Sequence, residues 1–382
     1  MQKVGYYKLK KQGVLKGDWM TIIDASIQMG DQKCLVVLGC PMDQFPQNRA
    51  LNLKDMTPLC LQVVKGLNGK VIENALNEVN TIVGKIVSIN SDRGSDMLRG
   101  IKDFRKTNPE TRLTCDTSHR VANFLKARLE KDERWKEFRK QVTQARRKMQ
   151  NSKISCAMPP SPREKARFMS VSSLIEWAAN MITLLCAPDS LPSNQADEFL
   201  RYLGWLIEYD ADVTKWLCMT EMGKRARHLV RIEGLHAGLP EHFLDSISDL
   251  PLEPDGQNYS DLIYYFFLEQ TQGLDLFERH NGSSEIIESF FGKLKSMEQE
   301  QTAFGFTSLV LATLAHVGTL DYEIVGNAIS IVTLLDIETW SNKEIGVTIQ
   351  SKKRKLWRCI AGIKEKSGAK PSGFLERKVI GF

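Results

Sequence analysis

Apolar and polar positions follow two different periods along the first 116 residues of the chain. Trp19–Ala25 has the apolar character of a strand, and a second such segment follows at Lys33–Gly39 after a turn near Gly30, so the pair predicts a β-hairpin. Gly69–Val83 has apolar residues three or four positions apart, which is typical of an amphipathic helix. The other predicted strands are Leu59–Lys65, Lys85–Asn90 and Thr111–Asp116, and the other predicted helices are Ser95–Phe104 and Ser118–Glu130.

This order of elements combines an antiparallel meander with parallel crossovers. Three strands follow one another directly, and each of the last two strands comes after a helix. A strand that pairs in parallel with its predecessor needs such a crossover, whereas a hairpin does not. The pattern therefore predicts an α/β fold with a mixed five-stranded sheet.

Longer helices with apolar faces dominate the chain after Glu130. We expect three regions: 1–130 as an α/β head, 131–280 as a helical middle, and 281–382 as a helical tail. The segment Asn151–Ser161 is the predicted linker, and Leu239–Asn258 is predicted to be loop because it is rich in Pro, Asp and Gly. The predicted helices are Leu129–Met149, Ser170–Cys186, Gln195–Tyr209, Val213–Met222, Ser260–Gln270, Ser283–Glu300, Thr307–Val317, Ile324–Ile337 and Lys353–Ile363.

Composition narrows the class of protein. The 382 residues contain 42% hydrophobic and 26% charged side chains, as a folded globular protein does. No run of 18 apolar residues is present, and the N-terminus has no apolar segment of the secretory type, so we expect neither a membrane span nor a signal peptide. The eight cysteines include no CxxC pair, which argues against a zinc ribbon and favours free thiols in a reducing cytoplasm, with nucleoid association if the source is bacterial.

Charge is distributed unevenly along the chain. The net charge is +6, yet residues 120–167 carry 15 Lys and Arg against 5 Asp and Glu. Residues 189–288 carry 7 against 19, and residues 343–378 carry 11 against 3. Two basic blocks around an acidic one favour a polyanionic partner over a small metabolite, although a single block is equally explained as a solvated helix face.

Four carboxylates stand where an α/β protein gathers ligand groups. Asp24 lies at or near the end of the first predicted strand, and Asp92 directly follows the fourth. Glu285 and Glu288 share one face of a later helix. Carboxylates without a surplus of His or Cys favour Mg²⁺ or Mn²⁺, and two such ions are the usual device for attack on a phosphodiester. Each residue also has a structural explanation, as a turn or helix cap.

Four short motifs, in order, resemble those of RNase H-like DDE transposases of the Mutator, hAT and P-element types. The hairpin around Ile22-Ile23-Asp24 resembles the strand pair with the first acid, and Ser91-Asp92-Arg93-Gly94 resembles the second acidic position. Cys115-Asp116-Thr117-Ser118-His119 is similar to the C/DxxH motif, and Ser283-Ser284 with Glu288 resembles the helix that carries the last acid. The resemblance covers essentially the whole chain, and it implies an RNase H-like fold with a large helical insertion.

The resemblance also implies roles for individual residues. Asp24, Asp92 and Glu288 would bind two Mg²⁺ or Mn²⁺ ions for DNA strand cleavage and transfer, with Glu285 as the rival for the third position. Asp116 and His119 would support the pocket or position a nucleotide. The residues expected to contact DNA phosphates are Lys293, Lys295, Arg146, Arg147, Lys148, Lys352, Lys353 and Arg354.

One departure from the family concerns the N-terminal side of the core. Only about twenty residues precede Asp24, so we expect the domain that recognises transposon ends to be absent or supplied by a separate subunit. The resemblance further implies a homo-oligomer acting on transposon ends and target DNA. Two other functions stay open from the sequence: an inactive or domesticated DNA-binding relic, and a glycoside hydrolase that uses Glu285 with Glu288 or Asp24 with Asp92.

Overall fold

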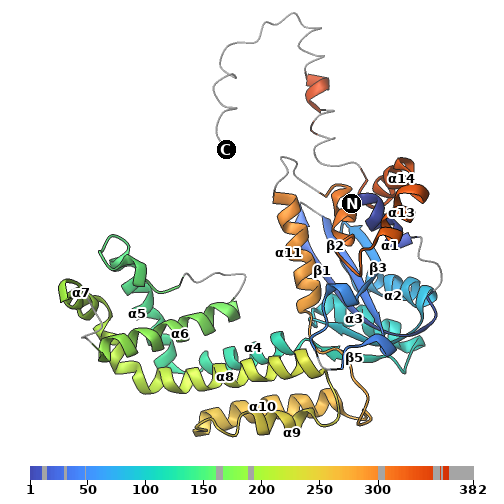
Figure 1. The fold of residues 1–382 in the computed structure, drawn as a ribbon. Coiled ribbons are helices and arrows are strands. Elements are labelled where there is room, and N and C mark those ends of the chain that lie inside the picture. The colour runs from blue at the N-terminus through green and yellow to red at the C-terminus, as the bar shows by residue number, and fades with distance from the viewer. Residues whose placement is uncertain are drawn as a thin grey trace, which may run out of the picture.

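The computed structural model consists of a sheet region and an elongated arm of helices that leads away from it (Figure 1). None of the described helices is long and apolar enough to cross a membrane. The structure describes residues 1–10, 15–29, 32–47, 49–160, 167–187, 193–299, 306–346, 353 and 356–360.

The sheet has five strands in the order β3-β2-β1-β4-β5. β1 pairs with β2, and β2 with β3, in antiparallel fashion, whereas β1–β4 and β4–β5 are parallel pairs. The predicted mixed five-stranded sheet of an α/β fold is therefore confirmed. The strands are β1 (Gly17–Met29), β2 (Gln32–Pro41), β3 (Thr57–Val64), β4 (Gly84–Ser91) and β5 (Arg112–Cys115).

Both faces of the sheet are covered, and neighbouring residues of one strand face opposite sides. On β1, Ile23 packs in the cluster formed with α2 and α3, whereas Ile22 packs in the cluster formed with α11 and α12. This explains the continuous apolar run of β2, since a strand buried on both faces has no polar side. The covering helices are α2 (Gly69–Val83) and α3 (Ser95–Thr107) on one face, and α1 (Gln2–Lys10), α11 (Glu285–Gln299), α12 (Leu309–Leu314) and α14 (Leu334–Glu344) on the other, with α13 (Tyr322–Ile331) against α1.

The arm has a hydrophobic core of its own. Phe138 is fully buried and contacts the rings of Trp135, Trp205, Tyr209 and Trp216 at centroid distances of 5.2–5.8 Å. The core of the arm is continuous with buried residues of the helix that follows β5. The arm comprises α4 (Thr117–Leu129), α5 (Glu133–Met149), α6 (Arg167–Cys186), α7 (Ser193–Leu203), α8 (Asp210–Glu233), α9 (Leu239–Ser246) and α10 (Pro254–Thr271).

Two predicted elements differ from the observed ones for identifiable reasons, and one observed helix was not predicted. The segment predicted as loop at 239–258 contains α9 and the start of α10, because Pro240 and Pro254 stand in the first turns of these helices, where a proline is tolerated. The helix predicted at Ile324–Ile337 is interrupted, since Thr333 and Asp336 form a capping box that starts α14. The sequence also gave no sign of α1, whose Leu9 is buried by distant segments.

Two segments predicted from the sequence lie partly outside the described residues. The predicted linker contains only the short 3₁₀ helix Ser155–Ala157 within its described part, 151–160. The predicted helix at 353–363 is helical at residue 353 and over 356–360, and its other positions lie outside the described residues.

Candidate active site

Three aspartates meet at the carboxyl ends of the parallel strands. The register of β1 with β4 pairs Ile22 with Asn90, so two residues further along Asp24 stands beside Asp92. The register of β4 with β5 pairs Ser91 with Cys115, and the next residues on the two strands are Asp92 and Asp116. Parallel strands end at the same edge, and the sequence therefore places the three carboxylates in adjacent positions of one row.

Among the described residues, the side chains of Asp24 and Asp92 each accept one local backbone hydrogen bond. The Asp24 Oδ1 atom accepts the N–H of Ala25 at 2.6 Å, and the Asp92 Oδ1 atom accepts the N–H of Gly94 at 2.9 Å. The second bond closes a tight turn, in which Arg93 has a left-handed φ of 64°. These contacts hold one oxygen of each carboxylate, and they leave the other for a ligand.

Glu288 reaches this edge because its helix is anchored to β5 and α4. The Thr114 hydroxyl donates to the Asn281 carbonyl at 2.8 Å, and the Thr117 N–H donates to the Gly282 carbonyl at 2.9 Å. Just before α11, the Ser284 hydroxyl contacts both the Asp116 Oδ2 atom and the Glu288 Oε1 atom, the latter at 3.4 Å. Residues more than 160 positions apart in the sequence thus share one hydrogen-bond network. The Ser283-Ser284 motif predicts the helix with the last acid, but the contact between Ser284 and Asp116 was not predicted.

Asp116 and His119 form a dyad on the first turn of α4. The Asp116 side chain is almost completely buried, and its Oδ2 atom lies 2.6 Å from His119 Nδ1. The hydrogen bond to Asp116 is the main cause that raises the pKa of His119 to about 9, with Glu288 and Asp92 contributing. His119 is therefore a cation at neutral pH in the metal-free protein.

The carboxylates repel one another, as they do where a cation belongs. Burial, followed by the charge of Asp92, raises the pKa of Asp24 to about 6, and Glu288 adds to this rise. Burial and then Asp116 raise the pKa of Glu288. Asp116, His119 and Glu288 each offer a ligand atom within 4.8 Å of the others. This cluster contains one ring nitrogen and two carboxylates, and it does not include Asp24 or Asp92. The oxygen donors that Mg²⁺ and Mn²⁺ favour are the carboxylates of this edge.

The structure separates the two candidate glutamates on α11. Glu288 faces Asp116 and His119, whereas Glu285 lies 3.6 Å from Arg231 and lines a neighbouring pocket. Glu288 therefore belongs to the cluster with Asp116 and His119, and Glu285 is paired with Arg231.

The predicted DNA-contacting residues fall into several places. Lys293 and Lys295 are both exposed on α11, and Lys293 lines the same pocket as Glu285. Arg146 is held by the Pro159 carbonyl at 2.5 Å, whereas Arg147 and Lys148 are exposed at the end of α5. Lys353 is exposed, and Lys352 and Arg354 lie outside the described residues.

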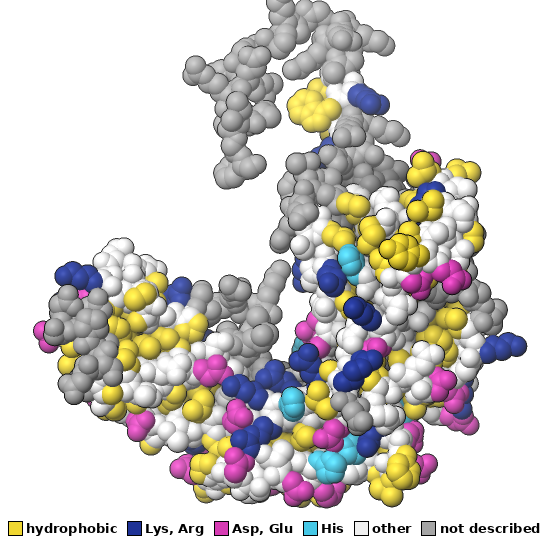
Figure 2. Space-filling model, in the orientation of Figure 1, with side chains coloured by type: hydrophobic (Ala, Val, Ile, Leu, Met, Phe, Trp, Pro, Cys, Tyr) yellow, Lys and Arg dark blue, Asp and Glu magenta, His cyan; other side chains and the backbone are white. Residues whose placement is uncertain are grey.

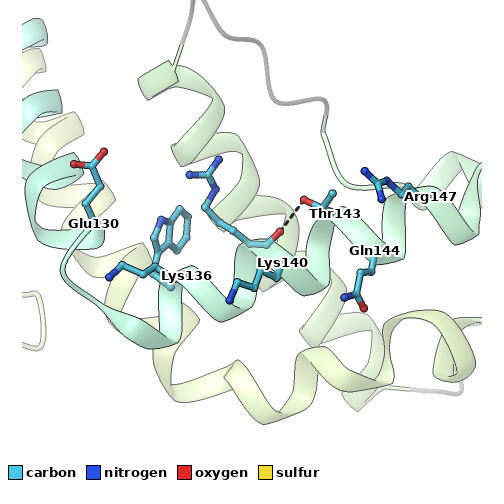
Figure 3. A pocket seen from close by; sticks show the side chains of 8 residues that line it. Glu130, Lys136, Lys140, Thr143, Gln144 and Arg147 are labelled. Carbon is cyan, nitrogen blue, oxygen red and sulfur yellow. Dashed lines mark hydrogen bonds between the residues drawn. The ribbon is translucent and has the colours of Figure 1, made fainter.

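A groove on α5 combines Arg147, which was singled out from the sequence, with further cations that were not. It has a volume of about 500 Å³, and the side chains of Lys136, Lys140, Thr143, Gln144 and Arg147 project along its length (Figure 3). Arg139 lines it as well. The spacing of these cations along α5 predicts that they lie on one face of the helix, because positions three and four apart share a face.

Glu233, His236 and His242 form a second cluster with metal-ligand atoms within 4.8 Å. Glu233 Oε2 lies 2.9 Å from both His236 Nε2 and His242 Nδ1. The Gly238 N–H donates to His236 Nδ1 at 3.2 Å, so the neutral ring carries its proton on Nε2 and donates it to Glu233. Hydrogen bonds account for this cluster, and a metal on Nε2 would need the opposite tautomer.

Comparison with known proteins adds one distant likeness. No protein-family model matches the chain, and no curated protein matches it. Among solved structures, the chain is similar to the Drosophila P element transposase strand transfer complex, with 11% sequence identity over 87% of this chain and 85% of that chain, and a TM-score of 0.38. A likeness with this TM-score says nothing about the chemistry of this chain.

Proposed function

We propose that the protein is the catalytic region of a DDE transposase, which cleaves and transfers DNA strands with two Mg²⁺ or Mn²⁺ ions. The observation that carries the proposal is the grouping of Asp24, Asp92 and Glu288, from three distant segments, at one edge of an RNase H-like sheet. Each of the three would be a metal ligand. Transposon ends and target DNA would be the substrates, and a homo-oligomer or a separate DNA-binding subunit would supply end recognition.

The donor set fits these ions on chemical grounds. Asp24 and Asp92 each keep an oxygen that the described hydrogen bonds do not use. Burial is the main cause that raises the pKa of Asp24, and the charges of Asp92 and Glu288, which a cation would offset, add to it. When bound, two divalent ions activate a hydroxyl nucleophile and stabilise the leaving oxygen in an in-line displacement.

The remaining side chains position the reacting groups. Ser284 fixes the start of α11 and orients Glu288. Asp116 holds His119 through Nδ1, which leaves Nε2 as the ring atom that can donate to a DNA phosphate. The protonated ring would offset part of the phosphate charge and hold the strand beside the carboxylates.

Loss of one acid tests the proposal. The measurement is Mg²⁺- or Mn²⁺-dependent nicking of supercoiled plasmid by the wild type, Asp92→Asn and a matched control, Asp96→Asn. Asp96 is exposed in the first turn of α3 and lies outside the site. We expect Asp92→Asn to lose on the order of 100-fold or more of the rate and Asp96→Asn to keep it. Nicking that is unchanged in Asp92→Asn would overturn the assignment.

A second function, DNA binding without catalysis, is favoured by the exposed cations on α5. Arg139, Lys140 and Arg147 form no ion pair with a carboxylate among the described residues. A relic of this kind would bind DNA in a strongly salt-dependent way, and binding would survive replacement of all three acids. The plasmid assay separates the two functions, because only the enzyme nicks.

A further inference from the structure

A basic pocket lies on the flank of α11 next to the proposed catalytic carboxylates. It has a volume of about 680 Å³ and is formed by the β2–β3 connection, the end of α8, the start of α11 and the end of α12. Figure 2 shows Lys and Arg side chains in a band on the face where the sheet region meets the helical arm. The polar and charged residues of the pocket used below are Lys54, Arg231, Glu285, Ser289, Lys293 and His316.

The charge of the pocket is strongly positive. Lys54 and Lys293 are exposed and form no ion pair among the described residues, and Arg231 has only Glu285, at 3.6 Å, as a partner. Three cations therefore face one carboxylate. Burial, and then the nearby ammonium groups of Lys293 and Lys8, lower the pKa of His316.

Cations from separate segments converge here, and among the described residues only Arg231 has an acidic partner, Glu285. Lys54 comes from the β2–β3 connection, Arg231 from the last turn of α8, and Lys293 from α11. Asp55, next to Lys54 in sequence, is already bound by Arg49 through two contacts of 2.7 Å. A concave site with three cations and one carboxylate has a positive electrostatic potential, which favours the binding of an oxyanion.

The pocket also has an apolar side. Leu51, Leu53 and Ile286 line it and are partly or largely buried. A free inorganic phosphate would leave this wall unused, whereas the sugar and base of a nucleotide would cover it. The volume suits a ligand of that size.

Position along α11 connects the pocket to the carboxylates. Glu288 faces Asp116 and His119, and Lys293 follows it five residues later, about 7.5 Å along the helix axis and about 140° around it. One DNA strand advances about 3.4 Å per nucleotide in B-form DNA. A strand that curves around the flank of α11 from the carboxylates would bring a phosphate about two nucleotides away to Lys293.

We infer that this pocket binds a phosphodiester group and the adjoining nucleoside of a DNA strand, on one side of the phosphate that is held at the carboxylates. The inference deepens the proposed function and depends on it for the identity of the substrate. Lys54, Arg231 and Lys293 would contact phosphate oxygens, and the apolar wall would pack against the sugar and base. These contacts position the strand and read no sequence.

The test is fluorescence anisotropy of a labelled 20-nucleotide single strand and the matching duplex, with the full chain in EDTA so that metal ions and cleavage play no part. Lys54→Gln, Arg231→Gln and Lys293→Gln are compared with the wild type and with Lys102→Gln, an exposed lysine on α3 outside the pocket. We expect each pocket variant to bind about 3–10-fold more weakly and to lower the slope of log affinity against log salt by about 1. Lys102→Gln should change affinity less than twofold.

Competition separates the sources of phosphate. Thymidine monophosphate and inorganic phosphate are titrated against the bound oligonucleotide. Displacement only at high millimolar concentrations supports a strand site, whereas micromolar displacement that is lost in the three pocket variants would assign the pocket to a small phosphorylated compound and overturn the inference. Equal oligonucleotide affinity in the wild type and the pocket variants would overturn it as well. Since the binding assay needs no catalysis, its result is independent of plasmid nicking. The proposed catalytic function can fail while the pocket is shown to bind DNA, and the pocket can fail to bind DNA while nicking is observed.

Discussion

Ser284 donates a hydrogen bond to Asp116 across 168 positions of sequence. This contact joins the start of α11 to the end of β5, and the same hydroxyl lies 3.4 Å from Glu288 Oε1. A single small side chain thus sets the position of the third acid relative to the sheet. Removal of this hydroxyl should disturb stability and catalysis together.

Ser284→Ala should destabilise the protein by about 1–3 kcal/mol, because the buried Asp116 carboxylate loses a donor. Ser284→Thr keeps the hydroxyl and should retain most of the stability and of the nicking rate. Urea unfolding followed by circular dichroism, together with the plasmid assay, measures both effects. Wild-type stability in Ser284→Ala would show that the bond to Asp116 contributes little.

Asp24 should make the metal-free protein less stable as the pH rises. Its pKa is raised from 3.8 to about 6 in the folded state, so the folded protein holds a proton that the unfolded chain releases. Its contribution to stability is therefore most favourable below pH 3.8 and declines as the pH rises through 6.

In EDTA at pH 7.5, Asp24→Asn should consequently have a higher Tm than the wild type, and the difference should shrink toward pH 4. Asp18→Asn, an exposed site at the opposite end of β1, is the control. A lower Tm for Asp24→Asn at pH 7.5 would contradict the charge repulsion described for the site. Metal-dependent activity should fall below pH 6, since the ions need the ionised carboxylate.

His119 should titrate near pH 9 rather than near 6.5 in the metal-free protein, because Asp116 holds the charged ring. Its stabilising contribution is complete below pH 6.5 and is lost as the pH rises through 9. NMR of the ring protons, assigned by comparison with His119→Gln, measures this directly. A midpoint near 6.5 would mean that the dyad does not form in solution.

Phe138→Ala should cost about 3–5 kcal/mol, because it empties the aromatic core of the arm. Phe277→Ala provides a matched control, since Phe277 is 90% exposed and its loss should change stability by less than about 0.5 kcal/mol. Urea denaturation compares the two. Similar small losses in both variants would show that the arm contributes little to global unfolding.

The sheet and the first two acids could be predicted from the sequence because their signals are local. Apolar patterns mark the strands, and Asp92 directly follows β4. The predicted strand end near Asp24 is wrong, since β1 continues in the hairpin to Met29, and only its parallel pairing with β4 ends just before Asp24. The spacing of apolar residues three or four positions apart was sufficient to predict that the arm is helical. The prolines in the first turns of α9 and α10 and the capping box of α14 are local signals as well. At 239–258 the positions of the two prolines outweigh the Pro-, Asp- and Gly-rich composition that predicted a loop.

The tertiary structure alone decided which side chains meet. It placed Glu288 beside Asp116 and His119 and Glu285 beside Arg231, a choice that residues three apart on one helix do not settle. It brought Ser284 to Asp116, and it gathered Lys54, Arg231 and Lys293 into one pocket. Periodicity and capping depend on neighbours within a few residues, whereas these contacts join segments far apart in the chain. Their geometry is fixed by how the helices pack on the sheet.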